Sequence, residues 1–509
     1  MDALALPLVI YYFLVIAVVC LYGLHRYWIV WVYLRVRDSA KAPHTPEKFP
    51  QLPLVTVQLP MFNEKQVARR IIEAACRIDY PRDRLQIQVL DDSTDESADI
   101  ARRCCQEMSD AGCDVEFIHR QDRNGFKAGA LDEAMHSAKG EFIIVFDADF
   151  VPPPDILLSI IDEFTDDSIG MVQTRWVHLN RDESLLTQIQ AMFLDGHFIV
   201  EQTARAYSGK WFNFNGTAGV WRKSCIDDAG GWQHDTLTED TDLSYRAQLA
   251  GWKFLYRYDV TCPAEIPPTL GAFLTQQHRW NKGLIQTAIK LLPRILRSDY
   301  SWSRKIEAWF HLTSPIVHIA ILLLVTLVIP SLFVSLPLEH VDWGWGVLYG
   351  GTFLFLGAFA ACTFYLTSQW AQGYSMLATL LRLPALLALG IGITVLNTKA
   401  ILEAVIGKKS PFVRTPKFNG ALVSELDPLA ARKKKRLPPG SIELLLGILM
   451  SVCFLVAIRR PFTLVGAPFI LLFASGFLWI GIASLRDSIR QSAINAGEAV
   501  LAQTNLTSE

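Results

Sequence analysis

Two aspartates, Asp147 and Asp149, follow the apolar run FIIVF and are separated by one alanine. A hydrophobic strand that stops at two carboxylates places two hard oxygen ligands at the edge of a sheet. Mg²⁺ and Mn²⁺ prefer oxygen ligands and often share their shell with substrate phosphates. Such an ion can neutralise a diphosphate leaving group. The pair therefore predicts metal-assisted chemistry on a diphosphate, and a solvated turn with two acids is the alternative.

Two other segments carry groups suited to a nucleotide. Asp91 and Asp92 follow the apolar run LQIQVL and can accept hydrogen bonds from a base or a ribose, unless they only cap the next helix. Lys127 stands between Gly125 and Gly129, where a loop enters a helix. Backbone amides at a helix N-terminus, together with a lysine, suit phosphate oxygens. The alternative is an N-capped helix with a flexible entry.

The segments around residues 240 and 280 could handle a second substrate. Thr238 is expected to cap a helix whose first turn holds Glu239 and Asp240. A carboxylate held near a substrate hydroxyl can remove its proton, although the same acids also suit a capping cluster. Arg279 can hold a diphosphate bidentately, and Trp280 can stack on the apolar face of a sugar ring. An amphipathic helix edge with a cation–π pair is the other interpretation.

The elements that position these residues can be predicted from apolar runs that alternate with helical stretches between 54 and 149. We expect strands at 54–60, 85–92, 115–120 and 141–149, and helices at 64–78, 95–108 and 125–138, with Asp95 near the start of the second helix. This alternation predicts βαβ units and a mostly parallel sheet. Ligands of such sheets bind outside the carboxyl ends of the strands, where all four strand-end aspartates fall.

Long apolar segments lie on both sides of this region. Residues 6–34 are long enough to cross a hydrocarbon core of about 30 Å, and the basic residues that follow predict a cytoplasmic next segment. Further spans are expected near 310–336, 347–370, 441–459 and 461–485. We interpret 374–405 as interfacial or re-entrant helices, because a crossing there would put the basic stretch 408–436 outside.

The composition lies between that of a soluble enzyme and that of a membrane helix bundle, since 51% of the 509 residues are hydrophobic and 19% are charged. We expect an N-terminal transmembrane helix at 1–40, a cytosolic catalytic domain at 41–300, a transmembrane hairpin at 301–373, interfacial helices with a basic loop at 374–440, a second transmembrane hairpin at 441–490 and a tail at 491–509. A net charge of −2 gives no basic field for nucleic acid. Nine scattered cysteines without a CxxC pair are typical of a reducing compartment.

Four short motifs occur in order: LDDSTD at 90–95, DAD at 147–149, TED at 238–240 and QQHRW at 276–280. Together they resemble the motifs of the family 2 glycosyltransferases, specifically of the cellulose-synthase-like branch. VQLPMFNE at 57–64, GFKAGAL at 125–131 and FNGTAGVWR at 214–222 look like segments of the A and C proteins of that branch, which make mannan or glucomannan and xyloglucan backbones. FVRTPK at 412–417 resembles the FxVTxK gating loop of such synthases, with Arg414 where that pattern has Val.

The resemblance implies a GT-A-like α/β fold, with a mostly parallel sheet, flanking helices and an α-helical transmembrane region. It implies that Asp240 is the general base and that Asp149, with Asp147, binds Mg²⁺ or Mn²⁺. The substrate-binding residues that it implies are Asp91, Asp92 and Asp147 for the nucleotide, Lys127, Gln276 and Arg279 for the diphosphate, Trp280 for the acceptor sugar, and Glu239 beside the base. One base and no protein nucleophile imply an inverting transfer and a β-linked product.

The resemblance leaves the donor open between UDP-glucose and GDP-mannose. The expected acceptor is a growing β-linked polysaccharide at the membrane. One alternative is transfer of a single sugar to a lipid or lipid-linked glycan. Another is a channel or carrier with a nucleotide-sensing domain. The expected partners are a nucleotide sugar, a glycan or lipid acceptor and membrane lipids, without nucleic acid and with accessory secretion subunits left open. We expect a plasma, inner or Golgi-type membrane, a cytosolic catalytic domain, and a lipid-headgroup anchor at the basic run 432–436.

Overall fold

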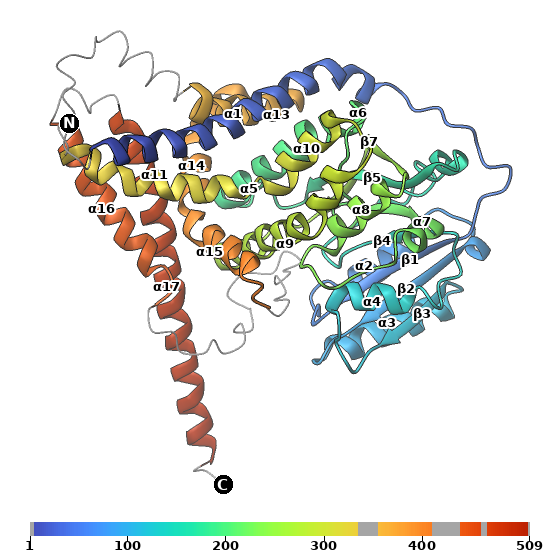
Figure 1. The fold of residues 1–509 in the computed structure, drawn as a ribbon. Coiled ribbons are helices and arrows are strands. Elements are labelled where there is room, and N and C mark those ends of the chain that lie inside the picture. The colour runs from blue at the N-terminus through green and yellow to red at the C-terminus, as the bar shows by residue number, and fades with distance from the viewer. Residues whose placement is uncertain (1–4, 334–354, 410–437, 460–465, 507–509) are drawn as a thin grey trace.

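The computed structural model describes residues 5–333, 355–409, 438–459 and 466–506. One part of the molecule is a sheet covered by helices, and the other is a group of long apolar helices (Figure 1). The first helix, α1 (Ala5–Lys41), runs along the apolar helices towards the sheet part. Residues 42–54, which contain no helix or strand, connect it to the first strand.

A sheet of seven strands, in the order β3-β2-β1-β4-β6-β5-β7, positions most of the predicted site residues. The strands are β1 (Val55–Met61), β2 (Leu85–Asp91), β3 (Asp114–His119), β4 (Phe142–Val145), β5 (Ile169–His178), β6 (Gly219–Arg222) and β7 (Lys253–Ala264). Neighbouring strands are parallel, except that β6 runs antiparallel to both β4 and β5. The mostly parallel sheet predicted from the sequence is therefore confirmed.

Helices cover both faces of this sheet. One core contains side chains of α2 (Ala68–Cys76) and α3 (Ser97–Asp110), and a second core contains those of α4 (Phe126–Ala134). Strand β4 contributes to both cores, since successive side chains of a strand point to opposite faces. The other elements here are η1 (Arg82–Arg84), η2 (Ile161–Thr165), α5 (Leu185–Asp195), η3 (Gly196–Gln202), α6 (Thr203–Tyr207), α7 (Lys223–Asp228), α8 (Glu239–Leu249) and α9 (Leu270–Arg297).

The fourth predicted strand is shorter than expected. Strand β4 ends at Val145, and both Asp147 and Asp149 lie in the turn that follows it. The ladder of hydrogen bonds stops because the amide of Asp147 donates to the hydroxyl of Thr217 at 2.9 Å rather than to a neighbouring strand. The two carboxylates are therefore carried by a turn and not by regular strand.

The other predicted boundaries differ only in detail. The helix expected at 125–138 ends at Ala134, and the first three strands lie within one or two residues of their predicted positions. Asp95 precedes α3, and its carboxylate accepts the amide of Ser97 at 2.9 Å, as expected near a helix start. Strands β5, β6 and β7 lie beyond the region for which the sequence predicted elements.

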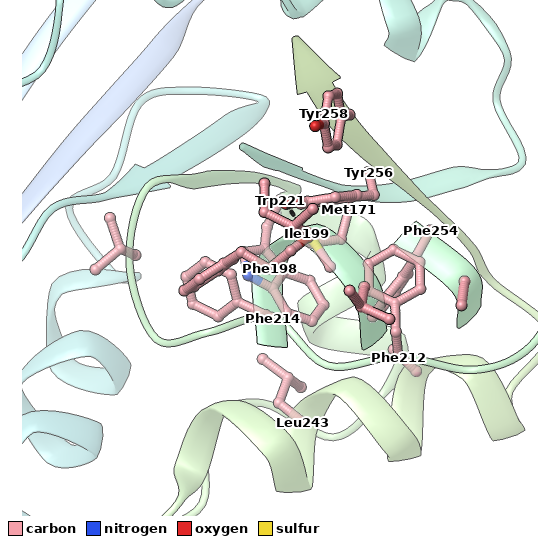
Figure 2. Close-up of a cluster of buried hydrophobic side chains, with 14 of the residues drawn as sticks. Met171, Phe198, Ile199, Phe212, Phe214, Trp221, Leu243, Phe254, Tyr256 and Tyr258 are labelled. Atoms are coloured by element: carbon pink, nitrogen blue, oxygen red, sulfur yellow. Dashed lines mark hydrogen bonds between the residues drawn. The ribbon is translucent and has the colours of Figure 1, made fainter. Parts of the chain in front are cut away.

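An aromatic core supports the loop that leads into β6 (Figure 2). Phe214 of this loop meets Trp221 of β6 edge to face, with ring centroids 5.6 Å apart. Trp221 meets Phe254 of β7 in the same way at 5.3 Å. Such pairs contribute about 0.5–1.5 kcal/mol each beyond their buried area. Leu243 of α8 belongs to the same core, so the loop and α8 rest on one support.

The second part of the molecule combines α1 with α10 (Trp302–Thr313), α11 (Ile316–Phe333), η5 (Phe355–Phe359), α13 (Ala360–Ala371), α14 (Met376–Gly392), α15 (Thr394–Val405), α16 (Ser441–Ala457) and α17 (Ala467–Leu506). By length and composition, three helical stretches among the described residues could cross a membrane: Phe13–Lys41, Met376–Val405 and Ala467–Arg490. Helices α10 and α11, bent by 58°, would add a fourth if they form one span.

The predicted membrane topology stays a prediction. Helices α14 and α15 together are long and apolar enough to cross a membrane. Only the charge pattern of the sequence therefore supports an interfacial position of 374–405. The gating-like loop 412–417 and the basic run 432–436 lie outside the described residues.

Helix α9 packs closely on the loop that leads into α8. A Cβ atom at Gly283 would lie 2.6 Å from Cγ2 of Thr238 and 2.9 Å from the backbone of Leu237. The amide of Leu237 donates to Gln286 at 3.0 Å. The hydroxyls of Thr238 and Thr287 are 3.2 Å apart. Only a residue without a side chain allows the two segments to approach this far.

Replacing Gly283 by alanine should therefore destabilise the protein. The added methyl group has to displace backbone atoms, and overpacking of this kind costs about 1–3 kcal/mol. We expect a lower midpoint of thermal unfolding for the purified protein. Gly271→Ala is the matched control on the same helix, because nothing lies within 4 Å of its Cβ position. Equal midpoints for the two variants would contradict the close approach.

Candidate functional site

The side chain of Lys127 joins three segments at the carboxyl edge of the sheet. Its Nζ atom lies 2.5 Å from Oδ1 of Asp147 and donates to the carbonyl of Gly216 at 2.8 Å. Lys127 belongs to the first turn of α4, Asp147 to the turn after β4, and Gly216 to the loop before β6. The lysine predicted to bind phosphate and the turn predicted to bind a metal are therefore in direct contact.

Asp240 lies beside the same lysine, in the first turn of α8. A Cβ atom at Gly216 would be 3.1 Å from Oδ2 of Asp240 and 3.6 Å from Nζ of Lys127. The other oxygen of Asp240, Oδ1, accepts the amide of Thr241 at 2.7 Å. One carboxylate oxygen is thus engaged by the start of its own helix, and the other faces the loop that carries Gly216.

The role predicted for Thr238 is wrong. Thr238 stands at the N-cap position of α8, but its side chain makes no capping hydrogen bond. Its hydroxyl instead lies 3.2 Å from the hydroxyl of Thr287 on α9. The tertiary contact with α9 takes the oxygen that would otherwise cap the helix, and the carboxylate of Asp240 accepts a first-turn amide in its place.

Burial and the neighbouring carboxylate of Glu239 raise the pKa of Asp240 to about 7, although Thr241 and Lys127 act in the opposite direction. For Lys127, burial alone would lower the pKa, but Asp147, Glu239 and Asp240 outweigh it and raise the pKa above its ordinary value. A carboxyl group that titrates near neutrality can accept and release a proton at physiological pH. Asp240 is therefore suited to proton transfer next to a fixed positive charge.

Arg279 brings helix α9 to the same group of acids. It is half-buried, and burial lowers the pKa of its guanidinium. The charges that oppose this shift belong to Glu239, Asp147, Asp240 and Asp149. Gln276 and Trp280 are also half-buried, and a spacing of four residues places them on one face of α9. Of the fourth motif, Arg279 thus lies with the predicted acids of the second and third motifs.

The aspartates of the first motif are held by basic residues at the end of β3. Nδ1 of His119 is 2.7 Å from Oδ2 of the buried Asp91. Arg120 donates from Nε and Nη2 to the two oxygens of Asp92, at 2.7 and 2.6 Å. It also donates to the carbonyl of Phe126 at 2.9 Å, which ties Asp92 to the first residue of α4.

Arg120 was not among the residues predicted from the sequence. The parallel register that pairs Asp91 with His119 is the signal that could have identified Arg120. The guanidinium carbon of Arg123 lies 3.3 Å from the ring centre of Phe62, and its Nε atom is 4.0 Å from Oδ2 of Asp92. Arginine stacked on an aromatic ring offers a flat, charged surface next to an aspartate predicted to bind a nucleotide.

The loops around Lys127 hold strained backbone. Among the residues that the structure describes, the non-glycine residues with positive φ are Asn63 (54°), Phe126 (52°) and Ala218 (54°). Asn63 follows β1, Phe126 is the first residue of α4, and Ala218 precedes β6. Such positions cost about 1–3 kcal/mol each and cluster at functional sites. The location of the strain supports the location of the site.

Asp147 and Asp149 are the residues that could hold a divalent metal, because their carboxylates are hard oxygen ligands. In the part of the chain that the structure describes, no group of three or more His, Cys, Asp or Glu side chains is arranged to hold a metal ion. The pair therefore fits an ion that completes its shell with substrate oxygens. Four carboxylates act on Arg279, whereas the cations beside them are Arg279 and Lys127. This excess of negative charge favours the binding of a cation.

Comparison with known proteins adds the family. Residues 50–283 match the family described as "Glycosyltransferase like family 2". The chain is 43% identical over 314 residues to the probable glucomannan 4-beta-mannosyltransferase 11 of Oryza sativa subsp. japonica, covering 60% of this chain and 55% of the relative. It is 33% identical over 410 residues to the glucomannan 4-beta-mannosyltransferase 7 of Arabidopsis thaliana, covering 79% of this chain and 71% of the relative. The matches span about half to three-fifths of the length of the first curated relatives.

A solved structure shares the fold. The mannosyltransferase PcManGT from Pyrobaculum calidifontis, in complex with GDP-Man and Mn²⁺, superposes with a TM-score of 0.52 at 19% identity, covering 78% of this chain and 100% of that chain. The GT-A-like fold class predicted from the resemblance is therefore confirmed. Because the Arabidopsis relative is similar over most of both chains, the predicted family is confirmed as well. This chain belongs to the glycosyltransferase family 2 enzymes, in their cellulose-synthase-like branch.

Proposed function

We propose that this protein transfers a hexose from a nucleotide sugar to the end of a growing β-linked glycan at a membrane. The observation that carries the proposal is the grouping of Lys127, Arg279 and Asp240. Two fixed cations stand beside one carboxyl group whose pKa lies near neutrality. Cations at this place can hold a diphosphate, and the carboxyl group can accept the proton of an acceptor hydroxyl.

GDP-mannose is the donor that the relatives favour, and UDP-glucose is the other candidate. The curated relatives are named as mannosyltransferases, and PcManGT was solved with GDP-Man. Asp91 and Asp92 would face the nucleotide. Lys127, Gln276 and Arg279 would face its diphosphate, because they come from the helix start and the helix that border the acidic group.

Asp240 acts as the general base in this proposal. It takes the proton of the acceptor hydroxyl while the hydroxyl oxygen attacks the anomeric carbon of the donor sugar. The bond between that carbon and the diphosphate breaks, and the configuration inverts because attack and departure occur on opposite faces. Glu239 helps to keep the pKa of Asp240 high through its charge. Trp280 offers a flat ring on which the acceptor sugar can stack.

Asp149, together with Asp147, would hold a Mg²⁺ or Mn²⁺ ion. When bound, the ion supplies positive charge to the departing diphosphate. Two carboxylates leave room in the metal shell for oxygens of the donor. The ion pair with Lys127 orients Asp147, so the lysine prepares one of the proposed ligands before the donor arrives.

A membrane location is supported by the helices that are long and apolar enough to cross a bilayer. The basic residues after the first of them favour a catalytic part in the cytosol. Processive elongation is favoured by the similarity to proteins named as glucomannan 4-beta-mannosyltransferases. Transfer of one sugar to a lipid or lipid-linked glycan would use the same chemistry with another acceptor. The length of the product distinguishes the two.

The proposal predicts that the purified protein releases nucleotide from GDP-mannose or UDP-glucose when Mn²⁺ or Mg²⁺ is present. Chelation with EDTA should abolish release, and restored metal should restore it. Asp240→Asn should lower the rate by roughly 10²-fold or more while donor binding persists, because only the base is lost. Asp99→Asn, an exposed position on α3, is the control and should keep the wild-type rate. Release of nucleotide and product length are measured together.

The outcomes of this experiment distinguish polymer synthesis, transfer of one sugar, and no glycosyl transfer. Product that stops at one added sugar would contradict polymer synthesis and support the lipid or lipid-linked acceptor. Absence of release from every sugar nucleotide would contradict the proposed activity. Full activity of Asp240→Asn would contradict its role as the base.

The pH profile follows from the raised pKa of Asp240, which lies at about 7. The base must be ionised, so kcat/KM should rise with pH and level off above this value, with a slope of about tenfold per pH unit on the acid side. Glu239→Gln removes a charge that raises this pKa and should shift the rising limb to lower pH. A profile that is flat across neutrality would contradict the assignment.

Gly216→Ala should lower kcat more strongly than it lowers the stability of the folded protein. The φ angle of Gly216 is +81°, and the new methyl group would stand 3.1 Å from Oδ2 of Asp240. Gly209→Ala is the matched control, because its φ is +69° and nothing lies within 4 Å of its Cβ position. Both variants bear similar backbone strain, but only the first should lower kcat, by about 10- to 100-fold. Equal losses of kcat would show that strain alone is responsible.

A further inference from the structure

The segment that follows α5 is the π-helix η3, whose side chains hold the loop before β6. Nε2 of His197 lies 2.8 Å from Oδ1 of Asn215. Nε2 of Gln202 donates to the carbonyl of Asn213 at 2.9 Å. π-helices are rare and occur frequently at functional sites. His197 and Gln202 are not among the site residues predicted from the sequence.

The loop held in this way, residues 213–217, carries the atoms that orient the site residues. The carbonyl of Gly216 accepts a hydrogen bond from Lys127 at 2.8 Å. The hydroxyl of Thr217 accepts the amide of Asp147 at 2.9 Å. A shift of this loop would therefore move the partners of both the lysine and the metal-binding turn.

Behind His197, a row of polar contacts leads to the first helix of the chain. Nδ1 of His197 is 3.3 Å from Glu201, which is 3.3 Å from Nη1 of Arg205. Nε of Arg205 donates to Glu307 of α10 at 2.9 Å. The other oxygen of Glu307 is 3.0 Å from Nε2 of His25 on α1. We call Glu201, Arg205, Glu307 and His25 the anchor row.

The anchor row is buried at its centre. The side chains of Arg205 and Glu307 are 3% and 4% exposed. Burial would raise the pKa of Glu201, but the charges of Arg205 and His197 outweigh it, and the pKa lies well below its ordinary value. Glu201 is therefore ionised between two partners. Removing one partner from a buried charge pair strongly destabilises a protein, because the other charge is left unpaired. We therefore expect the anchor row to keep this one arrangement.

We propose that His197 is a positioning residue for glycosyl transfer, and that the anchor row fixes it to helix α1. This inference rests on the proposed function. His197 does not contact the reacting groups but acts through Asn215 on the loop 213–217. The row thus links the position of the first helix to the orientation of Lys127 and Asp147 across η3, α6 and α10.

The test starts with His197→Leu, which removes both hydrogen bonds of a half-buried ring. The rate kcat of nucleotide release should fall about 10- to 100-fold, the range that a misplaced catalytic group produces. His197→Gln keeps an amide that can bond to Asn215 and should recover part of the rate. His44→Leu is the matched control: this half-buried histidine contacts Glu163 at 3.2 Å and the Tyr207 hydroxyl at 3.1 Å, away from the loop. It should lose comparable stability and keep kcat.

A double-mutant cycle tests the anchor row. His25→Leu should lower kcat in the same direction as His197→Leu, but by less, because it is further from the loop. The combined variant should lose less than the product of the two single effects, since both act through one set of contacts. Effects that simply multiply would overturn the link to α1.

Amide hydrogen exchange over residues 213–217 gives a readout that needs no turnover. Exchange should become faster in His197→Leu and stay at the wild-type rate in His44→Leu, because only the first variant frees the loop. Unchanged exchange in His197→Leu would overturn the positioning role. A wild-type protein that releases no nucleotide would overturn the proposed function alone, and the exchange measurement would still decide the inference.

Discussion

The contact between Lys127 and Asp147 is the constraint on which the rest of the site depends. The charge of this half-buried lysine must be matched, and its partners come from the turn after β4 and the loop before β6. The strand order puts β4 between β1 and the antiparallel β6, so these two segments meet at one edge. The aromatic core under the loop and the close packing of α9 on α8 then bring Asp240 and Arg279 to that ion pair.

Much of the first half of this arrangement could be predicted from the sequence. Strands β1 to β4 are apolar runs followed by helical stretches, and parallel strands bring their carboxyl ends together, so Asp92 and Asp147 could be assigned to one edge. Strand β6 could not be predicted, since four residues are too few for a periodic pattern. The partner of Thr238 was missed because it lies on a distant helix. His197 belongs to a π-helix, whose contacts no local motif signals.

Polar contacts join the sheet part to the apolar helices, in addition to apolar packing. Arg181 donates to Asp195 and to Gln369 of α13, at 2.6 Å in both cases. Arg382 of α14 donates to Gln188 of α5 at 2.7 Å. Charge-assisted hydrogen bonds are directional, so they restrict rotation as well as separation. The sheet part and the apolar helices are therefore held in a defined relative orientation.

Helix α9 is 28 residues long, and Arg279 and Trp280 lie in its interior. The backbone groups of interior helical residues are already bonded within the helix, so anything recognised there is recognised by side chains alone. The opposite side of the site consists of loops and helix starts, where the backbone itself bonds to side chains, through the amides of Asp147 and Thr241 and the carbonyl of Gly216. The two halves therefore allow different kinds of change. Loop length and backbone shape can change on one half, whereas the helical half can change only by exchanging one side chain for another.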